Sequence, residues 1–224
     1  MRRLIAIGGV LAAFAVLVGL GVWQLERRTW KHELLQSIDA GLTAPPASLT
    51  SAPGAGSAWR PATALGAWAG PPVRIAPIPR NGRAGADYAA ALRLRDGGAI
   101  VVRLGWAADG TPPPALAAGP VEVAGVLVAA AEPNAFTPDN RPPNEWFWLE
   151  PAAIAAAAGL PPGAASPLVL NATKPPAGLD AVPGRPNLPD DHLHYALTWF
   201  GLAAALLVVA GLLVRRSRRP AGQP

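Results

Sequence analysis

Two long, uncharged apolar runs constrain this 224-residue chain more than any other feature. One covers residues 4–25 and the other covers residues 195–214, and neither contains Asp, Glu, Lys or Arg. In an α-helix with a rise of about 1.5 Å per residue, about 20 apolar residues cross the roughly 30 Å hydrocarbon layer of a bilayer. Each run therefore predicts a transmembrane helix.

A cleaved signal peptide is the alternative interpretation of the first run, because Ala13-Phe14-Ala15 resembles a cleavage site. The apolar stretch of a signal peptide is about 7–15 residues long. The run in this chain continues well beyond Ala15. Its length favours an uncleaved membrane anchor.

Positive charge is concentrated beside the two runs. Six arginines flank them, at positions 2, 3, 215, 216, 218 and 219, whereas residues 26–194 hold 13 Lys or Arg and 14 Asp or Glu. A nucleic-acid-binding protein places its positive charge on the folded domain, which argues against a nucleic-acid partner. Lys and Arg accumulate on the cytoplasmic side of membrane spans. The pattern predicts that both termini are cytoplasmic, that residues 215–224 form a basic cytoplasmic tail, and that residues 26–194 lie outside the cytoplasm.

Residues 26–194 are numerous enough for one domain with its own core. The first helix is expected to continue to about Gly41, and residues 44–56 are predicted to be a linker or surface loop. Asp96-Gly97-Gly98 is typical of a hairpin turn, and residues 151–158 predict a short helix. The predicted strands cover residues 73–78, 88–95, 99–105, 121–130, 146–149 and 168–171.

Short turns between successive strands favour an antiparallel sheet or small barrel over a parallel sheet. The predicted fold class is therefore a membrane protein in which two transmembrane α-helices flank a β-rich, α+β periplasmic domain.

Familiar catalytic motifs do not occur in the sequence. It contains no phosphate-binding loop, no Gly-rich dinucleotide turn, no His-Glu-x-x-His and no Gly-x-Ser-x-Gly. There is no Cys, which excludes thiolate metal sites and thiol nucleophiles. These observations favour a protein that is not an enzyme and has no catalytic residues. A membrane-anchored periplasmic enzyme remains an alternative.

One candidate motif lies at the outer end of the first run. Trp23, Arg27 and Trp30 are spaced at i, i+4 and i+7, which places them on one helical face. Tryptophan is favoured at membrane interfaces, and an arginine can stack on its ring as a cation–π pair. Anchoring at the interface explains these three residues. It does not explain Gln24, a polar amide at the edge of the hydrocarbon.

A second motif begins just before the second run. His192, Tyr195 and Trp199 share a helical face, whereas His194 is turned about 200° away. His192 has two interpretations, which its spacing leaves open. It is either an interfacial side chain hydrogen-bonded to lipid headgroups or to Asp191, or a ligand of an apolar cofactor such as haem.

Taken together, the two motifs resemble the Surfeit locus protein 1 family of cytochrome c oxidase assembly factors. The first is Leu-Gly-Val-Trp-Gln-Leu followed by Arg27 or Arg28, Trp30 and Lys31. The second is His-Leu-His-Tyr-Ala-Leu-Thr-Trp-Phe at residues 192–200, which looks like the family's His-Leu-x-Tyr-Ala-x-Thr-Trp-Phe. Residues 85–107 and 121–148 match the family more loosely. The chain has Asp87-Tyr88 where the family has an aromatic–His pair, and Arg103-Leu104-Gly105-Trp106 where it has Asn-Arg-Gly-Trp.

The resemblance implies a chaperone of the respiratory chain, located in a bacterial inner membrane. Such a protein would bind haem a and assist its insertion into the core subunit of cytochrome c oxidase, alongside other assembly factors. His192 would be the ligand of the haem iron, and the surrounding cofactor-binding residues would be Trp23, Gln24, Arg27, Arg28, Tyr195 and Trp199. A haem-independent scaffold that stabilises an oxidase assembly intermediate is the alternative.

Overall fold

The computed structural model describes residues 1–186 and 188–218, with the side chains of residues 2, 3, 217 and 218 excepted. Two compact units are present: residues 1–37 with 187–224, and residues 38–186. The end of the predicted basic tail, residues 219–224, lies outside the described residues.

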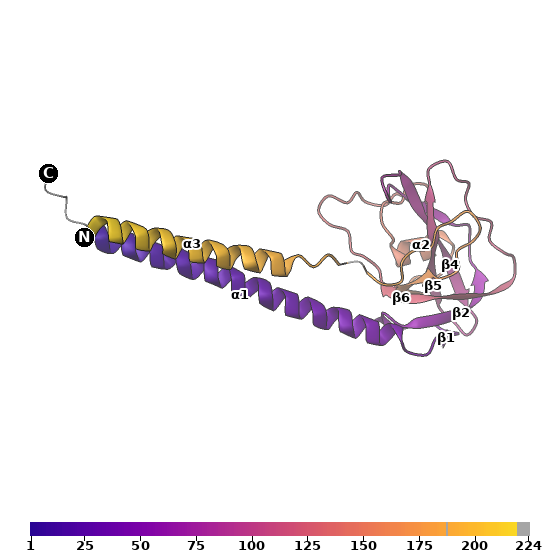
Figure 1. Ribbon diagram of the computed structural model, residues 1–224. Helices are drawn as coiled ribbons and strands as arrows, with labels where there is room; N and C mark the ends of the chain where they lie inside the picture. The colour runs from indigo at the N-terminus through magenta and orange to yellow at the C-terminus, as the bar shows by residue number, and fades with distance from the viewer. Residues whose placement is uncertain (187, 219–224) are drawn as a thin grey trace. The chain divides into compact units, whose positions relative to one another are not determined.

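The first unit consists of two long helices, α1 (Arg2–Leu42) and α3 (His192–Arg218), of which α1 runs on into the second unit. Both are long and apolar enough to cross a membrane, over Leu4–Leu42 and His192–Arg216. The two helices lie side by side (Figure 1). The predicted spans at residues 4–25 and 195–214 thus fall within longer helices, and α1 continues to the expected position near Gly41.

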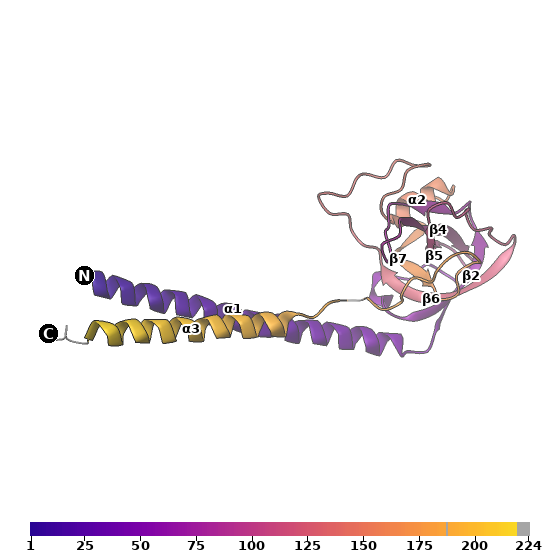
Figure 2. The same cartoon turned by 45° about the horizontal axis from the view of Figure 1, so that its top comes forward.

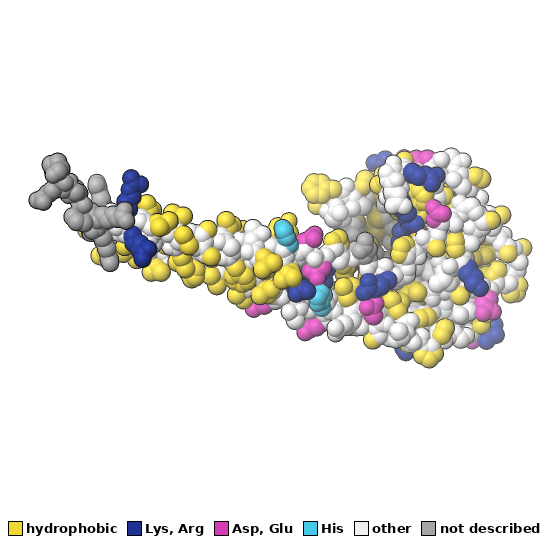
Figure 3. All heavy atoms as spheres, viewed as in Figure 1, with side chains coloured by type: hydrophobic (Ala, Val, Ile, Leu, Met, Phe, Trp, Pro, Cys, Tyr) yellow, Lys and Arg dark blue, Asp and Glu magenta, His cyan; other side chains and the backbone are white. Residues whose placement is uncertain are grey.

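Hydrophobic side chains cover the outer surface of this helical pair (Figure 3). Leu4, Val16, Val208 and Leu212 are each at least 59% exposed, which in water would be unfavourable for so many large apolar residues. A bilayer removes that penalty, because its acyl chains are as apolar as leucine. Charged and histidine side chains gather at one end of the pair, and Lys or Arg side chains at the other (Figure 3).

Small residues allow α1 and α3 to pack closely. A Cβ atom added to Gly21 would lie 2.6 Å from Cε1 of Phe200, and Ala196 and Ala203 are only 1% and 3% exposed. Toward the two termini the helices separate (Figure 2), and a Cβ atom on Gly8 or Gly211 would meet nothing within 4 Å. The close contact between Gly21 and Phe200 thus lies away from the two termini.

The second unit is built on a seven-stranded sheet within the described residues, ordered β1-β2-β6-β7-β5-β4-β3. An additional pairing between β2 and β4 closes β2, β6, β7, β5 and β4 into a ring, which confirms the predicted small barrel. Pairings β1–β2 and β5–β7 are parallel and the others are antiparallel. The strands are β1 (Ala47–Leu49), β2 (Pro61–Trp68), β3 (Val73–Ile75), β4 (Gly85–Leu94), β5 (Ala99–Ala108), β6 (Pro120–Ala129) and β7 (Ala165–Ala172).

Side chains alternate between the inside and the outside of this ring, as the period of a strand requires. The inner core includes Leu92, Ile100, Val102, Leu127 and Leu170, all fully buried. A second core on the outer face joins β4 and β5 to the short helix α2 (Pro151–Ala157), which begins with a proline as predicted. The turn between β4 and β5 is the predicted Asp96-Gly97-Gly98 hairpin, with φ of +121° and +73° at the two glycines.

Three parts of the strand prediction were wrong. The predicted linker at residues 44–56 contains β1, β2 was missed altogether, and residues 146–149 do not form a strand. In the last case Trp146 forms an isolated bridge with Ile75 of β3, and the side chain of Asn140 replaces a partner strand for Phe147 and Trp148. Its Oδ1 accepts hydrogen bonds from the backbone N–H groups of Phe147 (2.8 Å) and Trp148 (3.3 Å), and its Nδ2 donates to the Trp148 carbonyl (3.2 Å).

Candidate functional site

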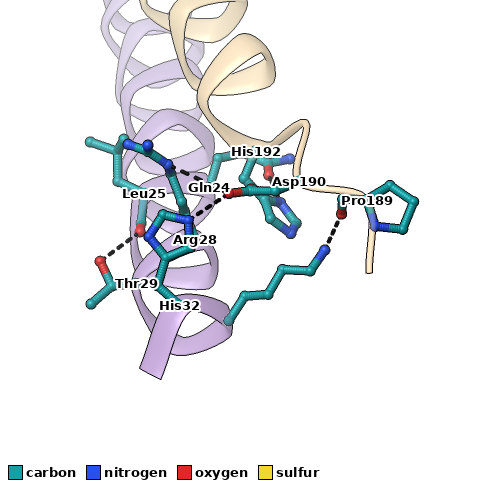
Figure 4. Close-up of polar contacts among 9 residues, drawn as sticks. Gln24, Leu25, Arg28, Thr29, His32, Pro189, Asp190 and His192 are labelled. Carbon is teal, nitrogen blue, oxygen red and sulfur yellow. Dashed lines mark hydrogen bonds and ion pairs between the residues drawn. The ribbon is translucent and has the colours of Figure 1, made fainter. Parts of the chain in front are cut away.

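The packing of α1 against α3 brings His192 to Gln24. His192 is the first residue of α3, and its Nδ1 lies 2.8 Å from Oε1 of Gln24 on α1 (Figure 4). This contact explains the polar amide at the edge of the first apolar run, which interfacial anchoring left unexplained. It also identifies a partner for His192 other than Asp191 or lipid headgroups.

The hydrogen bond determines which nitrogen of the ring is available. An amide oxygen can only accept, so Nδ1 of His192 carries the proton and donates it. In the neutral imidazole Nε2 then holds the lone pair, and among the described residues no hydrogen bond to it is found. Metal-binding histidines have this arrangement, in which a second-shell acceptor holds one ring nitrogen and the other nitrogen faces the metal.

A cavity of about 250 Å³ lies next to the His192 ring. Four of the predicted cofactor-binding residues line it: Trp23, Gln24, His192 and Tyr195. Trp23 and Tyr195 are 53% and 54% exposed, so the cavity is open toward the surface of the helical pair. Small-molecule sites commonly measure about 300–1,000 Å³, and a cavity of this size would enclose only part of a large flat ligand.

The other predicted residues lie beside this cavity or face away from it. Trp199 is half-buried and does not line the cavity. The Arg27 guanidinium stacks over the Trp30 ring at 4.0 Å, which is one of the two cation–π pairs considered from the sequence. Arg28 approaches Asp190, with 3.7 Å between its Nε and Oδ2 of the carboxylate.

Three residues that the sequence reasoning did not select complete this polar cluster. His32 Nε2 lies 2.8 Å from Oδ2 of Asp190, and Lys31 Nζ donates a hydrogen bond to the carbonyl of Pro189 (Figure 4). The available signal was the spacing of Gln24, Arg28 and His32 at i, i+4 and i+8, a polar stripe along one face of α1.

The cluster keeps Asp190 ionised. Partial burial acts to raise the pKa of this carboxyl, but hydrogen bonds from His32 and from the His192 backbone N–H, with the charges of His32 and Arg28, hold it below its usual range. Within the described residues, no group of three or more His, Cys, Asp or Glu is arranged to hold a metal ion. The site can therefore offer one imidazole nitrogen to a metal, flanked by aromatic rings and cationic side chains.

Comparison with known proteins places these features in one family. Residues 11–204 match the model of the SURF1 family. A SURF1-like protein of Monosiga brevicollis is 28% identical over 241 residues, covering 95% of this chain and 89% of that protein. Surfeit locus protein 1 of Xenopus tropicalis is 27% identical, covering 83% and 68%, and that of Homo sapiens is 26% identical, covering 84% and 70%.

Proposed function

This chain belongs to the SURF1 family, and from that premise we propose that it is a non-enzymatic assembly factor for cytochrome c oxidase. Membership of the family is consistent with such a role. In the proposed function the two helices anchor the protein in a bacterial inner membrane. The site around His192 binds haem a and presents it to the oxidase core subunit, in cooperation with other assembly factors.

The hydrogen bond between His192 and Gln24 is the observation that carries this proposal. It joins the two helices, fixes the tautomer of the ring and leaves Nε2 free to bind iron. The bound haem would supply an iron centre that accepts an imidazole as axial ligand. Gln24 orients that imidazole, so a change in the packing of α1 against α3 would alter the strength of binding.

The residues around His192 fit such a group in their chemistry. Trp23 and Tyr195 provide aromatic surface, and the exposure of both leaves room for a macrocycle that the 250 Å³ cavity holds only in part. Arg28 and Lys31 lie within the same polar cluster and are the cations that would attract propionate groups. Arg27 stacks on Trp30 and is less suited to that task.

We expect His192→Ala to remove most of the haem from protein purified out of a host that makes haem a. His194→Ala is the matched control, because His194 is exposed and is turned about 200° away along the helix. Gln24→Leu should retain some haem with an altered spectrum, because the ligand remains but its orienting acceptor is lost. The measurement is the absorption spectrum at matched protein concentration, with membrane insertion confirmed.

Identical spectra and haem content in the wild type and His192→Ala would defeat the ligand assignment. If the wild type bound no haem but still co-purified with the oxidase core subunit, the haem-independent scaffold would be the better description. Turnover of a small substrate by the purified protein would instead favour a membrane-anchored enzyme.

A further inference from the structure

The β-strand unit contains a cavity of about 320 Å³, distinct from the one beside His192. Its floor consists of side chains on the outer face of the ring of strands, from β4, β5, β6 and β7: Asp87, Arg103, Val128, Val169 and Asn171. Its walls are residues 129–133 and 147–149, with Ile75, Ile78 and Thr137. All of these residues belong to the same compact unit.

Two buried oxygen atoms on this floor lack a hydrogen-bond donor. Asp87 is 1% exposed, and its Oδ2 accepts a hydrogen bond of 2.8 Å from Nε of Arg103. Its Oδ1 accepts none within the described residues, and Nη2 of Arg80 is 3.7 Å from it. Asn171 is 5% exposed, and its Oδ1 also accepts none from the described part of the chain.

Both side chains adjoin Arg103. Asp87 pairs with the Arg103 guanidinium, and Asn171 lies opposite Arg103 in the register between β5 and β7. Both side chains therefore line the same cavity from neighbouring positions, with the two oxygen atoms themselves buried. A buried acceptor without a donor costs more stability than a hydrogen bond usually contributes, so such atoms in folded proteins normally have a partner.

The chemistry of the floor restricts what that partner can be. Carboxylate and phosphate groups only accept hydrogen bonds and would be repelled by Asp87. A primary ammonium group donates three hydrogen bonds, and those to a carboxylate are charge-assisted. The lining holds two acidic side chains, Asp87 and Glu132, and one basic side chain, Arg103, and Arg80 outside the lining makes the total neutral. The preference for an ammonium group therefore rests on its three N–H donors and not on net charge.

The residues of the cavity walls indicate the chemistry of the rest of the ligand. Phe147, Trp148 and Leu149 present aromatic and aliphatic surface, and a volume of 320 Å³ is at the lower end for small-molecule sites. Aromatic faces also attract cations. We propose that this cavity binds a small primary ammonium compound with a compact apolar substituent, whose N–H groups donate to Oδ1 of Asp87 and Oδ1 of Asn171.

The test uses the full chain in lipid nanodiscs, titrated calorimetrically with phenethylammonium chloride. The comparison probes are 2-phenylethanol, which has the same shape and no charge, and phenylacetate, which carries the opposite charge. Empty nanodiscs provide the correction for partitioning into lipid. We expect saturable binding of the ammonium compound, at least tenfold tighter than binding of the alcohol, and no saturable binding of phenylacetate.

Ala131→Phe provides the site control. Ala131 lines the cavity but is exposed, so the larger side chain should fill the space without disturbing the core, and ammonium binding should weaken at least tenfold. Ala118→Phe, at an exposed position outside the cavity lining, should bind as the wild type does. Asp87 is left intact, because its removal would leave Arg103 without its buried partner.

Absence of saturable binding would overturn the proposal and would leave water as the partner of the two oxygens. A preference of less than tenfold over the alcohol would also overturn it, as would saturable binding of phenylacetate. Unchanged ammonium binding in Ala131→Phe would place the binding elsewhere in the protein and would equally count against it.

Discussion

Asp87 and Arg103 lie on neighbouring strands of the ring, and the structure shows that they contact each other. Their side chains form a hydrogen-bonded ion pair between β4 and β5. Burial raises the pKa of the Asp87 carboxyl, and the charge and hydrogen bonds of Arg103 oppose that rise only in part. Loss of Arg103 would therefore leave the buried Asp87 carboxylate without its hydrogen-bond donor.

We predict that Arg103→Leu lowers the free energy of unfolding by about 3–5 kcal/mol, the usual cost of removing one partner of a buried ion pair. Arg95→Leu is the matched control. Arg95 pairs with Asp96 at 3.2 Å, but both side chains are more than half exposed. Loss of a surface pair of this kind costs about 0–1 kcal/mol. Denaturant unfolding in detergent, followed by tryptophan fluorescence, measures the free energy of unfolding of both variants. Equal losses of stability in the two variants would contradict the assigned role of the Asp87–Arg103 pair.

The effect of Arg103→Leu should also depend on pH. An acid whose pKa is raised by folding binds protons more tightly in the folded state, so its contribution to stability falls as pH rises. Without Arg103 the pKa of Asp87 should rise further above its ordinary value of 3.8. The loss of stability relative to wild type should thus be smallest below about pH 4 and grow toward neutral pH. A pH-independent difference would argue that lost packing, not charge, is responsible.

Among the helices, the contact between Gly21 and Phe200 holds the two candidate spans together. A Cβ atom at Gly21 would lie within 2.9 Å of three ring atoms of Phe200. Close approach of backbones through small residues is a common basis of helix association in lipid. This contact positions the site as well, because Gln24 lies less than one turn from Gly21 and meets His192 on the other helix.

We predict that Gly21→Leu moves the outer ends of the helices apart, because the new side chain must displace the Phe200 ring. Gly19→Leu is the control, since a Cβ atom there meets nothing within 4 Å. The chain has no native cysteine, so spin labels on Leu25→Cys and Leu193→Cys report the separation directly. The label distance should lengthen or broaden in Gly21→Leu and stay as in wild type in Gly19→Leu. Identical distances in all three proteins would show that this contact does not hold the pair.

The arrangement of the protein across the membrane follows from its two candidate spans and the arginines beside them. We propose that both candidate spans cross the membrane, which would put both termini on one side and residues 38–186 on the other. Arginines 215 and 216 follow the second apolar run directly, and the described structure carries helix α3 through both. The preference of Lys and Arg for the cytoplasmic flank supports the proposal that the termini are cytoplasmic.

We predict that a reporter fused after residue 110 is active in the periplasm and that one fused after residue 224 is active in the cytoplasm. Gly110 is a suitable fusion point, because it is exposed in the turn that follows β5. Paired alkaline phosphatase and fluorescent-protein fusions at each position measure the two sides independently. Cytoplasmic fluorescence from the fusion at residue 110 would contradict the proposed orientation.

The spans, the hairpin and most strands could be predicted because their signals are local: an uncharged run long enough to cross a bilayer, a Gly-Gly turn, and a period of two. Strand β2 could not be predicted in this way. Its residues, Pro61–Trp68, are mostly small and have a weak strand preference, and the strand is held mainly by pairing with both β4 and β6. Residues 146–149 looked like a strand, yet only Trp146 forms a bridge, and the side chain of Asn140 takes up the hydrogen bonds of Phe147 and Trp148.

The distinction between local signals and long-range contacts also applies to the His192 site and to the cavity beside Asp87. Helical periodicity placed His192 and Tyr195 on one face, since spacing along a helix depends only on the chain's own geometry. The acceptor of the His192 proton, however, lies 168 residues away on another helix, and strand register places Arg103 beside both Asp87 and Asn171. Such contacts depend on how helices pack and how strands align. A local pattern therefore identifies candidate side chains, and packing determines which of them meet.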